Sequence, residues 1–115
     1  MEDKLIELLE SFDFPVFRQG SLSEDEEYPH TFFTFWCNEE AENSAYDNET
    51  QSVIYDYDVN VYSDDAEQVY SLLKQARSLL KQNGFTIVSR GYDVMSDEDT
   101  HTGRGMNVVY INIEN

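Results

Sequence analysis

The stretch from Gln51 to Phe85 constrains the fold most, because the spacing of its apolar residues changes once along its length. Between residues 53 and 62, apolar and polar side chains alternate, which is the period of a half-buried β-strand. One face of this strand carries Val53, Tyr55, Tyr57, Val59 and Val61. The opposite face carries Asp56, Asp58 and Asn60. We predict one long strand here.

The second part of this stretch has the period of a helix. Its apolar residues recur at steps of three and four: Ala66, Val69, Tyr70, Leu73, Ala76 and Leu80, with Leu72 and Leu79 widening the stripe. Asp64 followed by Glu67 resembles a capping box at the start, and Gly84 offers a residue that tolerates positive φ at the end. We therefore predict that the strand leads directly into a helix spanning Asp64–Asn83, about 30 Å long.

The remaining segments complete a small α+β pattern. The predicted elements are a helix at Glu2–Phe12, a short edge strand at Val16–Arg18, a strand at Thr31–Cys37, and strands at Phe85–Tyr92 and Met106–Ile113. The order is α-β-β-β-α-β-β. We expect a single domain spanning residues 1–115, with an antiparallel or mixed sheet of about five strands and both helices packed on one face.

Three polar connections, Gly20–His30, Asn38–Thr50 and Ser96–Gly105, are each about a dozen residues long. Two of them contain runs of carboxylates. Loops of this length in a small domain are usually functional, or become ordered only against a partner. We expect them to be surface segments that meet another molecule.

The charge balance limits the partners of this chain. It contains 7 Lys and Arg against 24 Asp and Glu, which gives a formal net charge of −17. Such a charge opposes binding to phosphate backbones and to anionic membrane surfaces. The only cysteine, Cys37, excludes an intrachain disulfide and favours a reducing compartment, so we expect the protein in the cytoplasm. No apolar run approaches the roughly 18 residues of a membrane span.

The candidate chemistry is sparse. Asp56 and Asp58 share a strand face and could hold a cation with Asp64 or Asp65, but a solvated strand face accounts for them better, and we assign no metal site. His30 and His101 lie in polar loops outside any recurring catalytic motif, and Cys37 lies within an aromatic strand. We expect no enzymatic activity and no cofactor.

Three of the seven basic residues, Lys74, Arg77 and Lys81, fall on one stripe of the predicted helix. As a solvated face they would complement the negative end of the helix dipole. As a docking strip they would meet acidic loops of a neighbouring copy, since a protein of this charge that self-associates must place its few cations at contacts. Both interpretations leave these residues exposed.

Several stretches together resemble a family of small tail-assembly proteins of tailed bacteriophages and prophages. The resemblance rests on Phe32–Trp36, Tyr46–Asn48, Tyr55–Asp64 and the helix as far as Phe85. The family comprises proteins of the tail-terminator or tail-completion type, which belong to the head–tail joining proteins. The acidic loops Gly20–His30 and Ser96–Gly105 match no pattern of this family.

The resemblance implies a non-enzymatic protein that forms a ring, typically a hexamer, in the host cytoplasm and then in the virion tail. Such a ring ends the tail tube and offers a surface to the head connector. The interface residues expected from the pattern are Lys74, Arg77, Lys81, Trp36, Tyr46 and Asp47. A competing hypothesis is an acidic DNA mimic that inhibits a nucleic-acid-binding protein by presenting carboxylates in place of phosphates. Both hypotheses exclude sequence-specific binding of nucleic acid.

Overall fold

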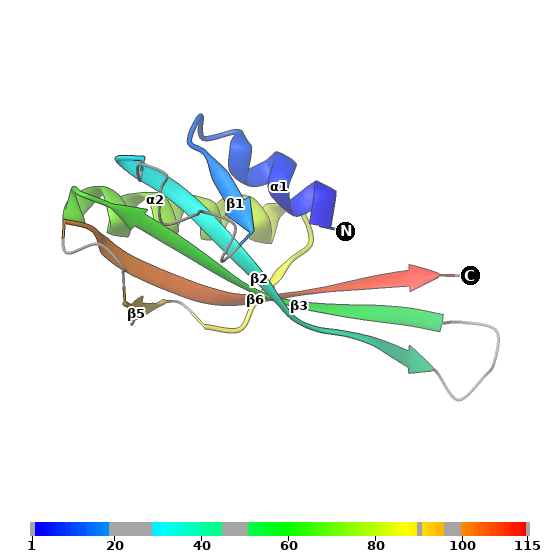
Figure 1. Cartoon of the computed structure of the whole chain (residues 1–115). Coiled ribbons are helices and arrows are strands. Elements are labelled where there is room, and N and C mark those ends of the chain that lie inside the picture. Colours follow the sequence, from blue (N-terminus) through cyan, green and yellow to red (C-terminus); the bar gives the residue numbers. More distant parts are fainter. Residues whose placement is uncertain (1, 19–28, 45–50, 90, 96–99, 115) are drawn as a thin grey trace.

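The computed structural model describes residues 2–18, 29–44, 51–89, 91–95 and 100–114 (Figure 1). Its elements are α1 (Glu2–Glu10), β1 (Val16–Arg18), β2 (Thr31–Ser44), β3 (Gln51–Ser63), α2 (Ala66–Gln82), β4 (Thr86–Ile87), β5 (Tyr92–Val94) and β6 (Thr102–Glu114). The predicted α+β class is therefore confirmed.

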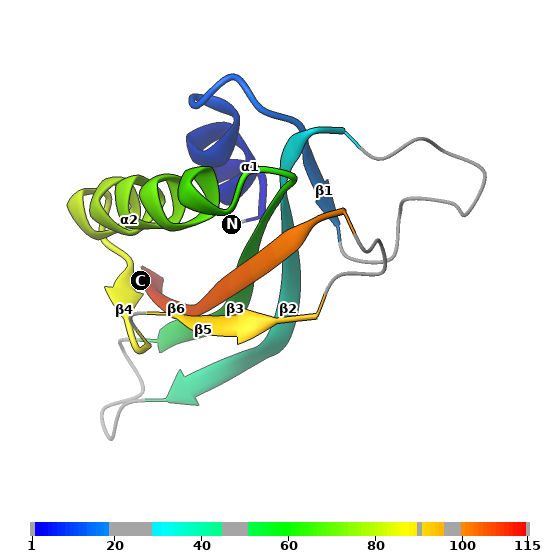
Figure 2. The same cartoon turned by 90° about the vertical axis from the view of Figure 1, so that its left-hand side faces the viewer.

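The strands form one mixed sheet in the order β1-β2-β3-β6-β4, with β5 also paired to β6. β1 is parallel to β2, and the other pairs are antiparallel. Viewed along the strands, both helices lie on the same face of the sheet, with α2 over the β4 side and α1 over the β1 side (Figure 2). The predicted packing of both helices on one face is confirmed.

The sheet has six strands where we predicted about five, because the segment predicted as one strand at Phe85–Tyr92 is divided. β4 pairs with Val108 and Val109, whereas β5 pairs with β6 from Gly103 to Gly105. Between them, the backbone N–H groups of Val88 and Ser89 both donate to the carbonyl of Asn107, at 3.0 and 3.3 Å. Two donors on one acceptor make a bulge, and the bulge interrupts the ladder.

Helix α2 begins one residue later than the capping-box pattern predicted. The N-cap is Asp65, whose carboxylate accepts a hydrogen bond from the backbone N–H of Glu67 at 3.0 Å. The carboxylate of Asp64 bonds a histidine instead, so the assignment of Asp64 as the cap was wrong. At the other end Gly84 has a φ of +94°, as predicted, and the N–H of Phe85 donates to the carbonyl of Leu80. This is the Schellman arrangement.

The core lies between the helices and the sheet. Helix α2 buries Val69, Leu72, Leu73, Ala76 and Leu80. Tyr70, which we included in the apolar stripe, is 54% exposed, whereas Leu72, which we expected to widen that stripe, is buried. Helix α1 ends at Glu10, two residues before the predicted end, and contributes Leu5 and Leu9 to the same core. The α1 and α2 side chains pack on Phe33, Phe35, Tyr57, Val59, Val61, Met106 and Val108 of the sheet.

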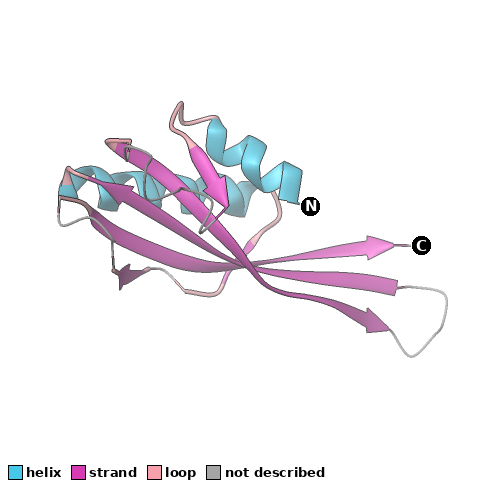
Figure 3. Ribbon diagram, viewed as in Figure 1, coloured by secondary structure: helices cyan, strands magenta, loops and turns pink. Residues whose placement is uncertain are grey.

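The strands β2, β3 and β6 continue well beyond the helix layer, as Figures 1 and 3 show. We call their outer parts, residues 39–44, 51–56 and 109–114, the arm. It begins where the register of β2 shifts between Cys37 and Glu39. Residues 38–44 were predicted as part of a loop, and the structure places them in β2. The rest of that loop lies outside the described residues, as do residues 20–28 and 96–99 of the other two connections. Residues 102–105, which were also predicted as loop, belong to β6, so this strand begins four residues earlier than predicted.

We call the sheet face turned away from the helices the open face. Near the start of β6 it is partly covered by packed side chains. There the rings of Phe32 and Tyr62 stack with centroids 5.2 Å apart. A Cβ atom at Gly103 would lie 2.6 Å from Cε1 of Tyr62 and 2.8 Å from Cγ2 of Val94. Glycine at this position therefore lets two side chains lie flat against β6.

Candidate functional site

The three basic residues predicted as a docking strip, which we call the cationic flank, lie on the outer side of α2, with Arg77 and Lys81 towards β4 and Lys74 beside a groove that Ser11 and Phe12 also line. Lys74 and Lys81 are exposed, and Arg77 is partly buried. A groove of about 450 Å³ beside them is lined by Arg77, Lys81, Phe85 and Ile87, among others. Neither Lys74 nor Lys81 forms an ion pair with another residue that the structure describes.

A fourth cation extends this flank, and the sequence pattern did not reveal it. The guanidinium of Arg104, from β6, lies over the ring of Tyr70 at 5.0 Å and donates to the Asp93 carboxylate at 2.8 Å. Tyr70 precedes Lys74 by one helical turn. This cation–π contact holds the Tyr70 ring at the surface. It gives a reason why Tyr70 is exposed although its helical spacing suggested burial.

Trp36, another predicted interface residue, lies on the open face. It pairs with Asp58 across β2 and β3, and its side chain is 50% exposed. The open face and the cationic flank of α2 belong to different sides of the molecule, so the structure does not bring these predicted residues together. Tyr46 and Asp47, the remaining predicted interface residues, lie outside the described residues.

The centre of the open face is a hydrogen-bonded acidic group. The amide of Asn107 donates to the carboxylate of Asp56 at 2.6 Å and to that of Asp58 at 3.2 Å. The hydroxyl of Tyr92 donates to Asp58 at 3.3 Å. Burial, and then the neighbouring Asp58 carboxylate, raise the pKa of Tyr92 to about 12, which keeps the phenol protonated. Asn107 and Tyr92 are partners that sequence spacing did not reveal.

This acidic group is not arranged as a metal site. Asp64 and Asp65, the further ligands that we considered, are engaged elsewhere, with His30 and with the start of α2. Within the described part of the chain, no three His, Cys, Asp or Glu side chains are grouped to hold a metal ion.

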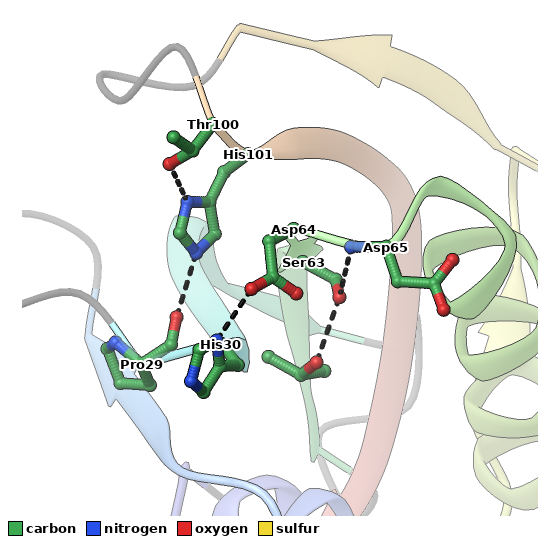
Figure 4. Close-up of polar contacts among 8 residues, drawn as sticks. Pro29, His30, Ser63, Asp64, Asp65, Thr100 and His101 are labelled. Carbon is green, nitrogen blue, oxygen red and sulfur yellow. Dashed lines mark hydrogen bonds and ion pairs between the residues drawn. The ribbon is translucent and has the colours of Figure 1, made fainter.

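Both histidines of the chain lie at one end of the sheet, where β2 begins and β3 ends (Figure 4). Nδ1 of His30 lies 2.6 Å from the Asp64 carboxylate, and Nε2 of His101 lies 2.8 Å from the carbonyl of Pro29. The hydrogen bond from His30 lowers the pKa of Asp64. These contacts join chain segments that are distant in sequence.

The serine next to this pair is not placed as a nucleophile. Ser63 is fully buried, its hydroxyl lies 2.9 Å from that of Thr31, and it accepts the N–H of Asp65 at 3.1 Å. Burial, followed by the charges of Glu40 and Glu2, raises the pKa of the Cys37 thiol, which disfavours the reactive thiolate. These arrangements stabilise the fold and supply no evident reacting group.

No known family model and no curated protein sequence matches this chain. None of the helices that the structure describes is long and apolar enough to cross a membrane.

Proposed function

We propose that this chain is a non-enzymatic structural protein of a phage tail, similar to tail-terminator or tail-completion proteins. It assembles into a ring at the tail end, caps the tail tube and joins it to the head connector. The observation that carries the proposal is the two-sided architecture: a helix layer with the exposed Lys74 and Lys81 on one side, and an open face extended by the arm on the other. A domain with two such surfaces can contact different partners at once.

The open face and the arm are proposed to meet the tube or the connector. Trp36 and Ile111, which are 50% and 53% exposed, lie on this face without a helix over them. Exposing large aromatic and aliphatic side chains to water is unfavourable in free energy, and aromatic residues are enriched in protein interfaces. This surface therefore suits a protein partner.

The cationic flank of α2 is proposed to serve self-association. A subunit with a net charge of −17 repels its own copies, and its few cations reduce that repulsion only where they lie at a contact. In a ring the remaining carboxylates would leave a negative lumen, through which DNA passes without adhering. The proposed location is the host cytoplasm during assembly and the virion tail afterwards, and no cofactor is needed.

The DNA mimic remains the second candidate, and its support is the net charge. A mimic needs carboxylates spread over a continuous face, as phosphates are spread along a duplex. On the open face, however, Asp56 and Asp58 are held by Asn107, and the exposed Trp36 pairs with Asp58 across β2 and β3. The proposal of a tail protein fits this mixed surface better.

Binding to purified tail tubes tests the proposal. Gold-labelled protein, viewed by electron microscopy, should mark one end of each tube. Trp36→Ala should reduce end occupancy at least severalfold, because it removes the largest exposed side chain of the open face. Met95→Ala, which removes a 94% exposed side chain after β5, is the control and should retain binding. Absence of end labelling by the parent protein, together with competition against DNA for a DNA-binding protein, would favour the mimic.

A further inference from the structure

The arm has two outer edges, formed by β2 on one side and by β6 on the other (Figure 3). Along the outer side of β6, β5 pairs with residues 103–105 and β4 with residues 108–109. No strand that the structure describes pairs with residues 110–114 on this side, and we call this segment the free edge. An unpaired edge strand presents backbone N–H and C=O groups that can pair with another chain.

The outward backbone groups of the free edge belong to Ile111 and Ile113. The carbonyl of Asn107 accepts two N–H groups from the bulge before β5, so it points away from β3. Along a strand, the backbone groups of alternate residues point to the same side. The outward set therefore continues from Asn107 through Val109, which pairs with β4, to Ile111 and Ile113.

The two edges of the arm differ in charge. The arm part of β2 carries Glu39, Glu40 and Glu42, whereas the free edge of β6 carries a single charged residue, Glu114. Charged residues on an edge strand hinder its pairing with another chain. In a protein with a net charge of −17, a second copy therefore meets less repulsion at the free edge of β6 than at the edge of β2.

We propose that the free edge pairs antiparallel with the same segment of a second copy, about a two-fold axis at Asn112. Ile111 of each copy then lies opposite Ile113 of the other, and each of these pairs exchanges two backbone hydrogen bonds. The register uses the whole segment between the last residue paired with β4 and the end of β6. The three arm strands of each copy join into one continuous sheet, with the two helix layers at opposite ends.

The same register provides a charge contact at each end of the paired segment. Glu114 of the partner subunit falls opposite Tyr110. A cation is already in place there, because Nζ of Lys4 lies 4.6 Å from the centroid of the Tyr110 ring and 3.3 Å from its hydroxyl. Lys4 forms no ion pair with another residue in the described part of the chain. This complementarity between Lys4 and Glu114 favours a second copy as the occupant of the edge.

The pairing goes beyond the proposed function and does not depend on it. It occupies the edge of the arm and leaves the open face and the cationic flank of α2 uncovered. Because a two-fold contact uses the free edge of both copies, association through it stops at a dimer and does not continue into a fibre. The contact is short, so the dimer should form only at high protein concentration.

Cysteine crosslinking tests the register, in a Cys37→Ser background that removes the natural thiol. Asn112→Cys places the two introduced thiols at the two-fold axis, in a pair whose Cα atoms are about 4.5 Å apart, within the range of a disulfide. The matched control is Ile111→Cys, whose copies are offset by two residues and lie more than about 7 Å apart. Under mild oxidation, Asn112→Cys should give at least severalfold more covalent dimer on a non-reducing gel. Equal or stronger crosslinking at residue 111 overturns the register.

Two further variants test the edge itself by sedimentation velocity, with circular dichroism to check folding. Ile113→Pro removes an outward N–H that takes no part in the ladder with β3, and it should abolish the dimer, whereas Ile113→Val should keep it. Lys4→Glu should weaken the dimer severalfold, and Lys4→Glu combined with Glu114→Lys should restore it at the net charge of the parent. A parent that stays monomeric at high concentration, or a folded Ile113→Pro protein that dimerises like the parent, overturns the pairing. Labelling of tube ends is measured separately, so either proposal can fail without the other.

Discussion

The same three strands, β2, β3 and β6, behave differently in their two halves. In the half under the helices, Phe33, Val59 and Met106 are completely buried. In the arm, Tyr55 and Tyr110 on the helix side are only partly buried, and Ile111 on the open face is 53% exposed. At the boundary the ring of Tyr110 contacts that of Phe85, with centroids 5.0 Å apart, and Nζ of Lys4 lies 4.6 Å from the Tyr110 ring centroid.

The difference follows from element lengths. Helix α2 has 17 residues, about 26 Å, whereas β3 and β6 have 13 residues each, about 43 Å when extended. A helix of this length cannot cover strands of that length, so part of the sheet must stay bare. Hydrophobic alternation indicates a strand in both halves but does not tell which half is covered. The covered half stabilises the domain, and the bare half is free to meet a partner.

Two substitutions in β6 should separate these roles most strongly. Met106→Ala, in the covered half, leaves a cavity in a fully buried site and should lower the free energy of unfolding by about 2–5 kcal/mol. Ile111→Ala, in the arm, should change it by no more than about 0.5 kcal/mol. Urea unfolding of the monomer followed by circular dichroism gives both values. Equal losses at the two sites would contradict the distinction between the halves.

A smaller change in the free energy of unfolding is expected at Gly103, which lies on the open face, opposite the helices. Gly103→Ala places a Cβ atom against the Tyr62 ring and Val94, and this overpacking should cost about 1–3 kcal/mol. The adjacent Thr102→Ala is the control, because Thr102 is exposed. Thermal unfolding of both variants measures the difference. A Gly103→Ala protein as stable as the control would show that the face is not sealed there.

The smallest expected effect is a pH-dependent contribution of Asp64 to the free energy of unfolding. The hydrogen bond from His30 lowers the folded-state pKa of Asp64 below its ordinary 3.8, so ionised Asp64 stabilises the folded state above that pH. The stabilisation is lost as the pH falls through the lowered pKa. Parent protein should therefore be slightly more stable than Asp64→Asn near pH 5, and the two should converge near pH 2. His30→Gln should remove the same advantage, and a difference that persists at pH 2 would contradict this origin.

Much of the fold could be predicted from the sequence because local patterns were strong. The strand–helix unit, the glycine after α2 and the common face for both helices are all confirmed. Two features depended on distant partners and could not be predicted: the split of β4 from β5, which a bulge against Asn107 creates, and the shift of the N-cap to Asp65, which follows from the pairing of Asp64 with His30.

The candidate site was less predictable. Helical spacing placed Lys74, Arg77 and Lys81 on one flank, and strand alternation placed Trp36 opposite Phe35. Spacing could not reveal that these residues lie on different sides of the molecule, because that depends on which face the helices cover. The pairing of Asn107 with Asp56 joins residues 51 positions apart, and only the strand register brings them together.

The mass of the assembled protein across a salt series tests the central claim most directly. Long-range repulsion between copies of charge −17 is screened over about 10 Å at 0.1 M salt and about 3 Å at 1 M, whereas close pairs at a contact are screened much less. The measured mass should therefore rise with salt towards a closed ring. A chain that stays monomeric at every salt and at high concentration, and that also fails to bind tail tubes, would contradict the account.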